Sequence, residues 1–351
     1  MKLRIWPALL ITLSLSACVD SYEFDTPDDV SFLVVDGRFT LDAGPHRLRL
    51  VKTTRLRSLV EMPVDFADVY LVDETGQRER YTQLGEGEYE LNPQEISGVE
   101  GRQYWLEIEL SNGSKYATHP QRMPGRLAAQ AAEFEIDGRV LNIYVSTLLP
   151  AGDETLWLRW GYDEVYAFPG IVCNPFGNVS ICYFYKRPVY RGITTLSTEG
   201  LTGSSLEKVK VTSDEDLRDN GQEFRGRHYY NVYQHSISEE AYEYWLKINQ
   251  VTVQTGSIFD APAAGVPGNA YNIDDPQEVV LGFFEVSNVD TVRTFILPGD
   301  IPPGTIPDFC PNINSWSQYL GYVQVFQMLP KEECCFCGTL PGDHIVKPDW
   351  F

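Results

Sequence analysis

The residues with the widest choice of chemistry in this sequence are its seven cysteines. Cys18 lies alone near the N-terminus. The other six lie from residue 173 onward: Cys173, Cys182, Cys310, Cys334, Cys335 and Cys337. A cysteine can carry a lipid, form a disulfide, ligate a metal ion or act as a nucleophile. The choice depends on the cellular compartment, so the residues before Cys18 determine how the other cysteines are interpreted.

Residues 1–17 have the layout of a secretory signal. Lys2 and Arg4 form a positive start, and residues 8–15 form an apolar run that is too short to span a bilayer as a permanent helix. The ending Leu15–Cys18, Leu-Ser-Ala-Cys, resembles a bacterial lipobox. This resemblance implies cleavage after residue 17, diacylation of the cysteine sulfur and acylation of the new amino group. An ordinary cleaved signal followed by a chance cysteine is the alternative.

The net charge of the chain excludes some classes of binding partner. The formal net charge is −21, and removal of Lys2 and Arg4 with the signal would make it more negative by two. Such a chain is repelled by nucleic acid and by anionic headgroups, so we expect no nucleic-acid partner. No later stretch is apolar for long enough to span a bilayer. Outer-membrane lipid would therefore hold the protein only through acylated Cys18.

Residues 18–29 predict an extended tether between the lipid and the folded protein. They contain five acidic residues and Pro27, and like charges together with proline keep a segment extended. An acidic stretch after a lipidated cysteine also resembles the surface-export signal of Bacteroidota lipoproteins, and a plain solvated spacer is the alternative. The expected location is the outer membrane, lipid-anchored, at the cell surface.

The remaining six cysteines predict disulfides, because their number is even and the protein is expected to be exported. Cys173 and Cys182 flank a turn-rich loop and pair most simply with each other. Cys310 must then reach the cluster Cys334–Cys337, within which the two adjacent cysteines are poorly placed to bond to each other. A zinc site made of these thiols and His344 is the alternative.

Aromatic residues gather on both sides of the loop between Cys173 and Cys182. Exposed aromatic side chains would suit stacking on a sugar or a hot spot for a protein partner. Alternation along a strand places Trp157 and Trp160 on opposite faces, so about half of these residues are expected in the core. Core and ligand face both remain open. The candidate face consists of Trp157, Trp160, Tyr162, Tyr166, Phe168, Tyr183 and Tyr185.

Catalytic motifs are missing from the sequence. It contains no nucleophile elbow, zinc-protease helix, P-loop or dinucleotide fingerprint. His228 and His235 are seven residues apart and would point to opposite faces of a strand, which argues against a metal pair. Asp260, Asp274 and Asp275 could hold calcium but lack the spacing of an EF-hand, and a turn is the alternative for the last two. We therefore predict no catalytic residue, no metal and no cofactor.

The elements that would position these residues are mainly β-strands. Residues 30–122 alternate between apolar and polar residues in short runs, as in Tyr104–Leu110, which predicts a β-sandwich of immunoglobulin or transthyretin type. Two prolines, Pro120 and Pro124, end this pattern, so residues 123–351 are expected to form a second β-rich domain. Residues 195–223 are polar without periodicity and predict a long loop.

One helix is predicted near residues 238–252. Ser238 can cap it, acidic residues occupy its first turn, and Ala241, Trp245 and Ile248 repeat at helical spacing. It should stop near Gly256, where glycine can adopt the left-handed conformation. The apolar run 279–286 predicts a buried strand covered on both faces, one of them by this helix.

The order of these motifs resembles the Bacteroidota family catalogued as domain of unknown function 4249. The residues that carry the resemblance, besides the lipobox, are Leu33–Gly37, Ser238–Trp245, Gly256–Pro262, Gly268–Asn269, Asn272–Pro276, Val280–Phe284 and Lys347–Asp349. The resemblance implies an outer-membrane lipoprotein, often encoded beside TonB-dependent transporters of the SusC type. It implies no catalytic residues.

Together these features predict an accessory protein that is not an enzyme and that binds a ligand or partner beside a TonB-dependent outer-membrane transporter. An envelope hydrolase of glycans or peptides is one alternative, and it would need a deep cleft with paired carboxylates of raised pKa. A structural adhesin or scaffold is the other alternative, and it would show flat faces and no pocket.

Overall fold

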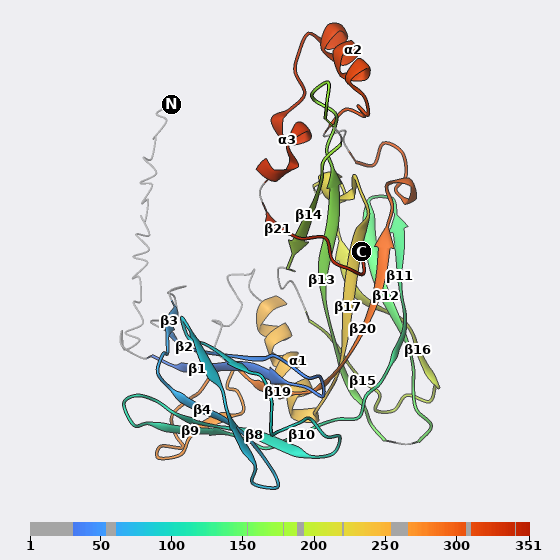
Figure 1. The fold of residues 1–351 in the computed structure, drawn as a ribbon. Coiled ribbons are helices and arrows are strands. Elements are labelled where there is room, and N and C mark those ends of the chain that lie inside the picture. Colours follow the sequence, from blue (N-terminus) through green and yellow to red (C-terminus); the bar gives the residue numbers. More distant parts are fainter. Residues whose placement is uncertain are drawn as a thin grey trace, which may run out of the picture.

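The computed structural model describes residues 31–53, 61–152, 154–177, 179–187, 193–219, 221–253, 266–306, 310–340 and 342–351. The predicted signal, Cys18 and the acidic tether lie outside the described residues. The described part is mainly β, as predicted, and its strands form four sheets (Figure 1). We name each sheet after one of its strands.

Two of the sheets pack face to face and form the N-terminal unit. The β1 sheet contains β1 (Leu33–Phe39), β2 (His46–Thr53), β3 (Glu61–Pro63), β6 (Thr82–Gly85), β7 (Glu88–Leu91) and β19 (Phe284–Val286). The β8 sheet contains β4 (Asp68–Asp73), β5 (Arg78–Arg80), β8 (Gln103–Glu109), β9 (Lys115–Thr118), β10 (Gln121–Arg122) and β18 (Ala270–Asn272). Alternating residues such as Leu33 and Val35 on β1 meet Leu106 and Ile108 on β8 in one core. A relationship to immunoglobulin or transthyretin domains stays a prediction.

Residues 270–286, which we call the return segment, come back from the C-terminal half of the chain and complete both of these sheets. β19 pairs with β1 in parallel, with Gly37 opposite Phe284, and β18 pairs with β9. A division of the chain at residue 122 therefore does not separate two independent units. The buried strand predicted for 279–286 is confirmed only at its end, because the strand spans Phe284–Val286 and Val279 is exposed. The predicted cover on both faces is confirmed there: Phe284 and Val286 face the N-terminal core, while Phe283 packs with the helix on the other side.

Gly282 lets the return segment approach β1, which leads to a stability prediction. It has φ +81°, and a Cβ added there would lie 2.3 Å from the Val35 carbonyl oxygen. We expect Gly282→Ala to lower the free energy of unfolding by about 1–3 kcal/mol, measured by chemical denaturation. Gly76→Ala is the control, because Gly76 has φ +85° but open space around its Cβ. Equal losses at both positions would contradict a role for the close contact.

The other two sheets form the C-terminal unit around a second core. The β12 sheet contains β11 (Ala129–Asp137), β12 (Val140–Leu148) and β16 (Ser205–Asp214). The β13 sheet contains β13 (Trp157–Pro169), β14 (Ile181–Lys186), β15 (Thr194–Ser197), β17 (His228–Ile237), β20 (Asn288–Ile296) and β21 (Asp343–Ile345).

The loop predicted for residues 195–223 is wrong, because this region contains β16, most of β15 and the 3₁₀ turn η1 (Gly221–Phe224). Lys208 on β16 has φ +52°, and the register with β12 shifts beside it. This bulge places Leu206 and Val211 in the same core although they are five residues apart. It thereby removes the alternation from which the strand could have been predicted.

The predicted helix is confirmed as α1 (Glu239–Val253), and the Ser238 hydroxyl accepts a hydrogen bond from the Ala241 amide at 3.2 Å. The predicted stop at Gly256 lies outside the described residues. The remaining helical elements are η2 (Pro298–Asp300), α2 (Trp316–Phe326), α3 (Glu332–Cys335) and η3 (Cys337–Thr339). Among the described residues, no helix has the length and apolar character needed to cross a membrane.

The six C-terminal cysteines form three disulfides: Cys173–Cys335, Cys182–Cys337 and Cys310–Cys334. The predicted pairing of Cys173 with Cys182 is wrong. The tail lies beside both residues, where the Ile171 amide donates to the Cys334 carbonyl at 2.7 Å and β21 pairs with β14, so each sulfur meets a tail cysteine instead. The predicted reach of Cys310 into the cluster is confirmed, and the two adjacent cysteines of the cluster do not bond to each other.

The zinc alternative is wrong, because all six thiols that it needs are oxidised in these disulfides. His344 would have been the histidine ligand of that zinc site. Its Nε2 instead lies 2.9 Å from the Leu340 carbonyl oxygen.

Candidate functional site

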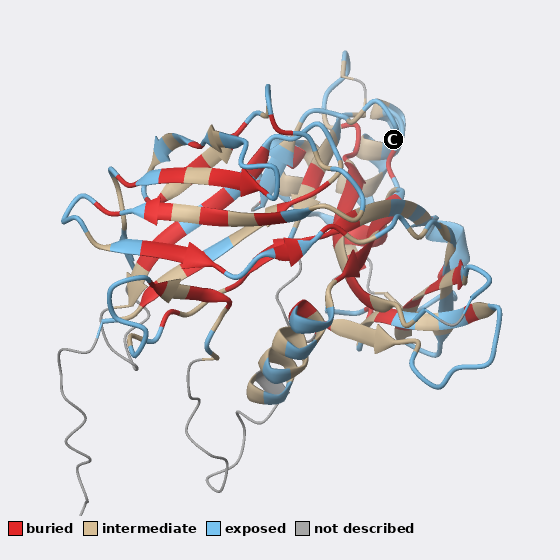
Figure 2. Cartoon of the chain, turned by 90° about the horizontal axis from the view of Figure 1, so that it is seen from below, coloured by how far each residue is buried: buried red, intermediate tan, exposed pale blue. Residues whose placement is uncertain are grey.

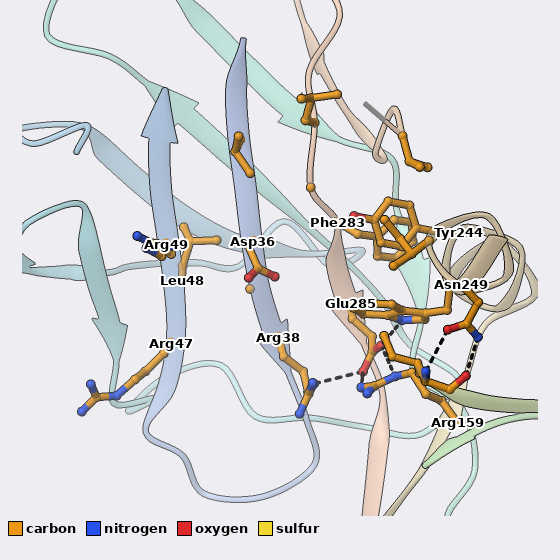
Figure 3. Close-up of a pocket in the computed structure, with 18 of the residues that line it drawn as sticks. Asp36, Arg38, Arg47, Leu48, Arg49, Arg159, Tyr244, Asn249, Phe283 and Glu285 are labelled. Carbon is orange, nitrogen blue, oxygen red and sulfur yellow. Dashed lines mark hydrogen bonds and ion pairs between the residues drawn. The ribbon is translucent and has the colours of Figure 1, made fainter. Parts of the chain in front are cut away.

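A groove of about 720 Å³ lies between the outward face of the β1 sheet and helix α1 (Figure 3). Its floor follows from the alternation of β1. Leu33, Val35 and Phe39 point into the N-terminal core, so Asp36 and Arg38 point outward into the groove. The floor continues across Arg47 and Arg49 of β2 and Glu88 of β7.

Helix α1 forms the opposite wall. Tyr244, Trp245, Ile248 and Asn249 lie on one helix face and line the groove. The Tyr244 ring stacks on the Phe283 ring of the return segment, with 4.8 Å between the centroids. In Figures 1 and 2, α1 lies between the two units, and most of its length is not fully buried. The groove is therefore built by segments that are far apart in the sequence.

Asn249 connects α1 to the start of β15. Its side-chain Oδ1 accepts a hydrogen bond from the Ile193 amide at 2.8 Å, and its Nδ2 donates to the Ile193 carbonyl. Ile193 itself lines the groove. This bidentate contact fixes one end of the wall against the C-terminal unit.

Glu285 is the electrostatic centre at the inner end of the groove. It is buried, and its carboxylate accepts hydrogen bonds from Arg159 Nη2 at 2.8 Å and Nε at 3.1 Å and from Trp245 Nε1 at 2.8 Å. Arg38 Nε lies 3.0 Å from it. Burial would raise the pKa of Glu285, but the attraction of Arg159 and then of Arg38 outweighs burial and holds the pKa well below its usual range. One carboxylate thus joins the return segment, β1, β13 and α1.

His235 lies beside this cluster, with Nδ1 3.8 Å from Glu285. Burial first, and then the charges of Arg159 and Arg38, lower the pKa of His235 well below its ordinary value. The folded protein therefore holds this histidine neutral.

The lowered pKa of His235 predicts how stability depends on pH. A group whose pKa is depressed by folding contributes stability above its unfolded pKa, about 6.5 for histidine, and loses it as pH falls below that value. We expect the free energy of unfolding to fall between about pH 6.5 and 5, by up to about 1.4 kcal/mol per pH unit from this group. Urea denaturation across this range should show a shallower slope for His235→Gln, and an unchanged slope would contradict the assignment.

The charged residues on the floor are mostly paired within the protein. Arg47 lies 3.0 Å from Glu90, and Arg49 lies 3.5 Å from Glu88. Asp36 differs, because its side chain forms no hydrogen bond or ion pair with any described residue. Desolvation by the groove walls raises the pKa of this carboxyl above its ordinary value, against the opposing effect of nearby arginines. The groove therefore presents an apolar wall and one carboxyl group that is open to a ligand.

A second cavity of about 560 Å³ adjoins the groove and shares Arg38 and Arg47 with it. It is more polar in character. Asp163 accepts hydrogen bonds from the hydroxyls of Tyr185 at 3.0 Å and Tyr233 at 2.6 Å. Burial and the charge of Asp163 raise the pKa of Tyr185 to about 12, so both hydroxyls stay protonated. The two cavities together offer an apolar compartment and a hydrogen-bonding compartment.

The aromatic face predicted around the disulfide loop is wrong for three of its residues. Trp160, Tyr166 and Phe168 are buried, because they share one face of β13, and that face is covered by the C-terminal core around Trp160 and by the disulfide-linked cluster around Phe168. Trp160 donates through Nε1 to Gln234 at 3.1 Å. The structure does not bring the predicted set together on one face.

The other four predicted aromatic residues are partly buried and lie in separate places. Tyr162 packs against the C-terminal core, and Trp157 packs beside α1. Tyr183 contacts the Phe351 ring, with 5.0 Å between the centroids. Tyr185 lines the second cavity and is the member of the predicted set that reaches a candidate site.

Sequence reasoning missed the residues of the groove. Asp36 and Tyr244 belong to segments that were predicted as a strand and a helix and as family motifs, but not as parts of a site. The alternation of β1 contained a usable signal, because it predicts that Asp36 and Arg38 share the outward face. That α1 covers this face could not be predicted, since the helix is distant in the sequence.

A buried cluster in the C-terminal unit brings Glu164, Glu223 and His228 together, with ligand atoms within 4.8 Å of one another. His228 Nε2 lies 2.9 Å from Glu164. Lys186 Nζ lies 2.8 Å from Glu223 and 3.7 Å from Glu164, so an ammonium group already pairs with both carboxylates. A cation would have to displace this lysine, and the cluster therefore favours an internal ion-pair network over a metal site.

The aspartates considered for calcium form a turn instead. The amides of Asp274 and Asp275 both donate to the side-chain oxygen of Asn272, at 2.8 and 3.1 Å. Asp260 lies outside the described residues.

Comparison with known proteins identifies a family but no function. The family described as Domain of unknown function (DUF4249) matches residues 19–293, which include the N-terminal unit, most strands of the C-terminal unit and every described residue of the groove. The match ends within β20, so the Lys347–Asp349 motif lies beyond it. No curated protein matches this chain. The resemblance predicted from the motifs is confirmed, and the chain belongs to the DUF4249 family.

Proposed function

We propose that this protein is a lipid-anchored binding protein of the cell envelope that holds a ligand or partner in the groove beside α1. The groove carries the proposal. Its volume of about 720 Å³ falls in the range of about 300–1,000 Å³ typical of ligand sites. Its wall offers Tyr244, Phe283 and Ile248 for apolar contacts, and its floor offers Asp36 for a polar contact. Flat faces without a pocket, as expected of a scaffold, do not describe this surface.

The charges of the groove support binding rather than hydrolysis. A glycan hydrolase uses two carboxyl groups, one of which has a raised pKa and acts as the acid. Asp36 has a raised pKa, but the other two described carboxylates that line the groove are engaged with arginines and are not free to act as its catalytic partner. Glu285 is held ionised by Arg159 and Arg38, and Glu88 is paired with Arg49. We therefore assign no catalytic residue and no cofactor.

The proposal also includes a lipid anchor at Cys18 and a transporter as the partner in the same membrane. Acylation of Cys18 would tether the protein to the outer membrane at the cell surface, and a tether raises the local concentration of a partner held in the same membrane. The lipobox and the family support this location. In this arrangement the protein would hold substrate for a TonB-dependent transporter of the SusC type, or close its outer mouth.

Crosslinking in intact cells tests the groove. A photoreactive phenylalanine analogue placed at Tyr244 should form an adduct with the ligand or with the neighbouring transporter. The same analogue at Leu148, which is exposed on the C-terminal unit, is the control. Adducts that form equally from both positions, or from neither, would contradict binding at the groove.

Mass spectrometry of the native N-terminal peptide tests the anchor. The expected peptide begins at Cys18 and carries fatty acyl chains on sulfur and nitrogen. An unmodified peptide from protein released into the medium would overturn the proposed location without affecting the groove.

A further inference from the structure

Helix α2 forms an exposed apolar tip on the C-terminal unit. It lies at the end of the molecule opposite the N-terminal sheets (Figure 1), between two cysteines that are disulfide-bonded to each other, Cys310 and Cys334. None of its 11 residues is buried. The exposed apolar side chains of the tip are Leu320, Val325, Phe326, Met328 and Leu329. Four of these five residues lie within 325–329, and such a concentration of exposed apolar side chains indicates an interaction surface.

The tip carries no charge although the protein is strongly acidic. Residues 310–330 contain no Asp, Glu, Lys or Arg, while the whole chain has 49 acidic and 28 basic residues. Two copies of this chain repel each other wherever their acidic surfaces face one another. At the tip they can approach without placing like charges together. Its tryptophan, tyrosines, phenylalanine and methionine, with no lysine or acid, match the composition of the centre of a protein–protein interface.

Gly321 indicates what approaches the helix. It is the middle residue of α2, where glycine is a much poorer helix former than alanine. A Cβ added there would meet no atom within 4 Å, so no described contact within the chain needs a glycine. A missing side chain does allow the backbone of another helix to come close. Ser317 and Val325 lie on the same helix face as Gly321 and are exposed. Met328 follows the left-handed C-cap Gln327 directly after the helix and is also exposed.

We propose that α2 packs against α2 of a second copy of this chain, antiparallel, around a two-fold axis that passes near Gly321. Because the glycine is central, the two-fold axis places the same residues on both sides and closes the interface on itself. Val325 and Met328 of each copy cover the apolar surface of the other. The groove beside α1 lies away from the tip, so both copies keep an open groove (Figure 1).

The mass of the full chain in a mild detergent, measured by light scattering with the detergent mass subtracted, tests this dimer. We expect twice the chain mass at about 10 μM protein. The double variant Val325→Glu with Met328→Glu should be monomeric, because four new carboxylates would face one another. The matched control is Leu84→Glu with Leu148→Glu, which adds the same charge at residues 53% and 54% exposed and should remain dimeric.

Gly321→Leu separates an interface role from a structural one. Leucine is a better helix former than glycine, so unfolding of the monomer should become less favourable. The added side chain should nevertheless weaken the dimer at least about tenfold. Three results would overturn the proposal: a monomeric native chain, a dimer that survives the glutamate pair, or tight dimerisation of Gly321→Leu. Binding of neutral phosphatidylcholine vesicles by the monomeric Cys18→Ser chain, lost in the glutamate pair, would assign the tip to lipid instead.

Discussion

Glu285→Gln is expected to lower the free energy of unfolding by about 3–5 kcal/mol, because it removes the counter-charge from a buried arginine. The Arg159 side chain is only 5% exposed, and Glu285 accepts both of its hydrogen bonds. Glutamine keeps the shape but leaves the guanidinium unpaired in a region of low polarity. Chemical denaturation followed by tryptophan fluorescence measures the loss.

Glu61→Gln is the matched control for this substitution. Glu61 also pairs with an arginine, Arg49, but both side chains are more than two-fifths exposed. Exposed pairs contribute at most about 1 kcal/mol. Similar losses for the two variants would mean that burial does not set the strength of the Glu285 cluster.

The Glu285 cluster also predicts behaviour in acid. Its folded-state pKa is depressed, so its contribution is present above the unfolded pKa, about 4.3, and is lost as pH falls towards the folded value. Below about pH 4 the native protein should therefore lose more stability than Glu285→Gln, and the difference between them should shrink. A constant difference down to pH 2 would contradict this electrostatic role.

Removal of both long-range disulfides is expected to cost far more than removal of either one. Cys173–Cys335 and Cys182–Cys337 join nearly the same two segments, with sequence separations of 162 and 155. While one bond remains, the other closes an additional loop of only about 11 residues, worth about 3 kcal/mol. Loss of the second bond then opens the full loop and costs about 5 kcal/mol more.

Alanine replacements of one pair, and then of both pairs, test this under non-reducing conditions by chemical denaturation. Replacement of Cys310 and Cys334 is the control, because this bond closes a loop with a separation of 24 and encloses α2 alone among the longer helices. It should loosen the tip without affecting unfolding of the N-terminal unit. Losses for the two long-range pairs that simply add would show that the bonds do not act in parallel.

The sequence alone determined the properties that depend on neighbouring residues. Alternation predicted the mainly β architecture, and Ser238 with its acidic first turn predicted the start of α1. Motif order predicted the family, and cysteine number predicted disulfides. The strands and the helix can be predicted because their hydrophobic periods repeat within a few residues of sequence. Motif order and cysteine number are read directly from the sequence.

Tertiary structure decided what depends on distant contacts. The return of residues 270–286 to the N-terminal sheets, and the disulfide partner of Cys173, each require knowing which segments lie side by side. Trp160 and Phe168 proved to be core residues because distant segments cover the face of β13 that they share, which no pattern within β13 reveals. The groove arose in the same way: Asp36 points outward from β1 for a local reason, but only the packing of α1 over that face turns it into a site.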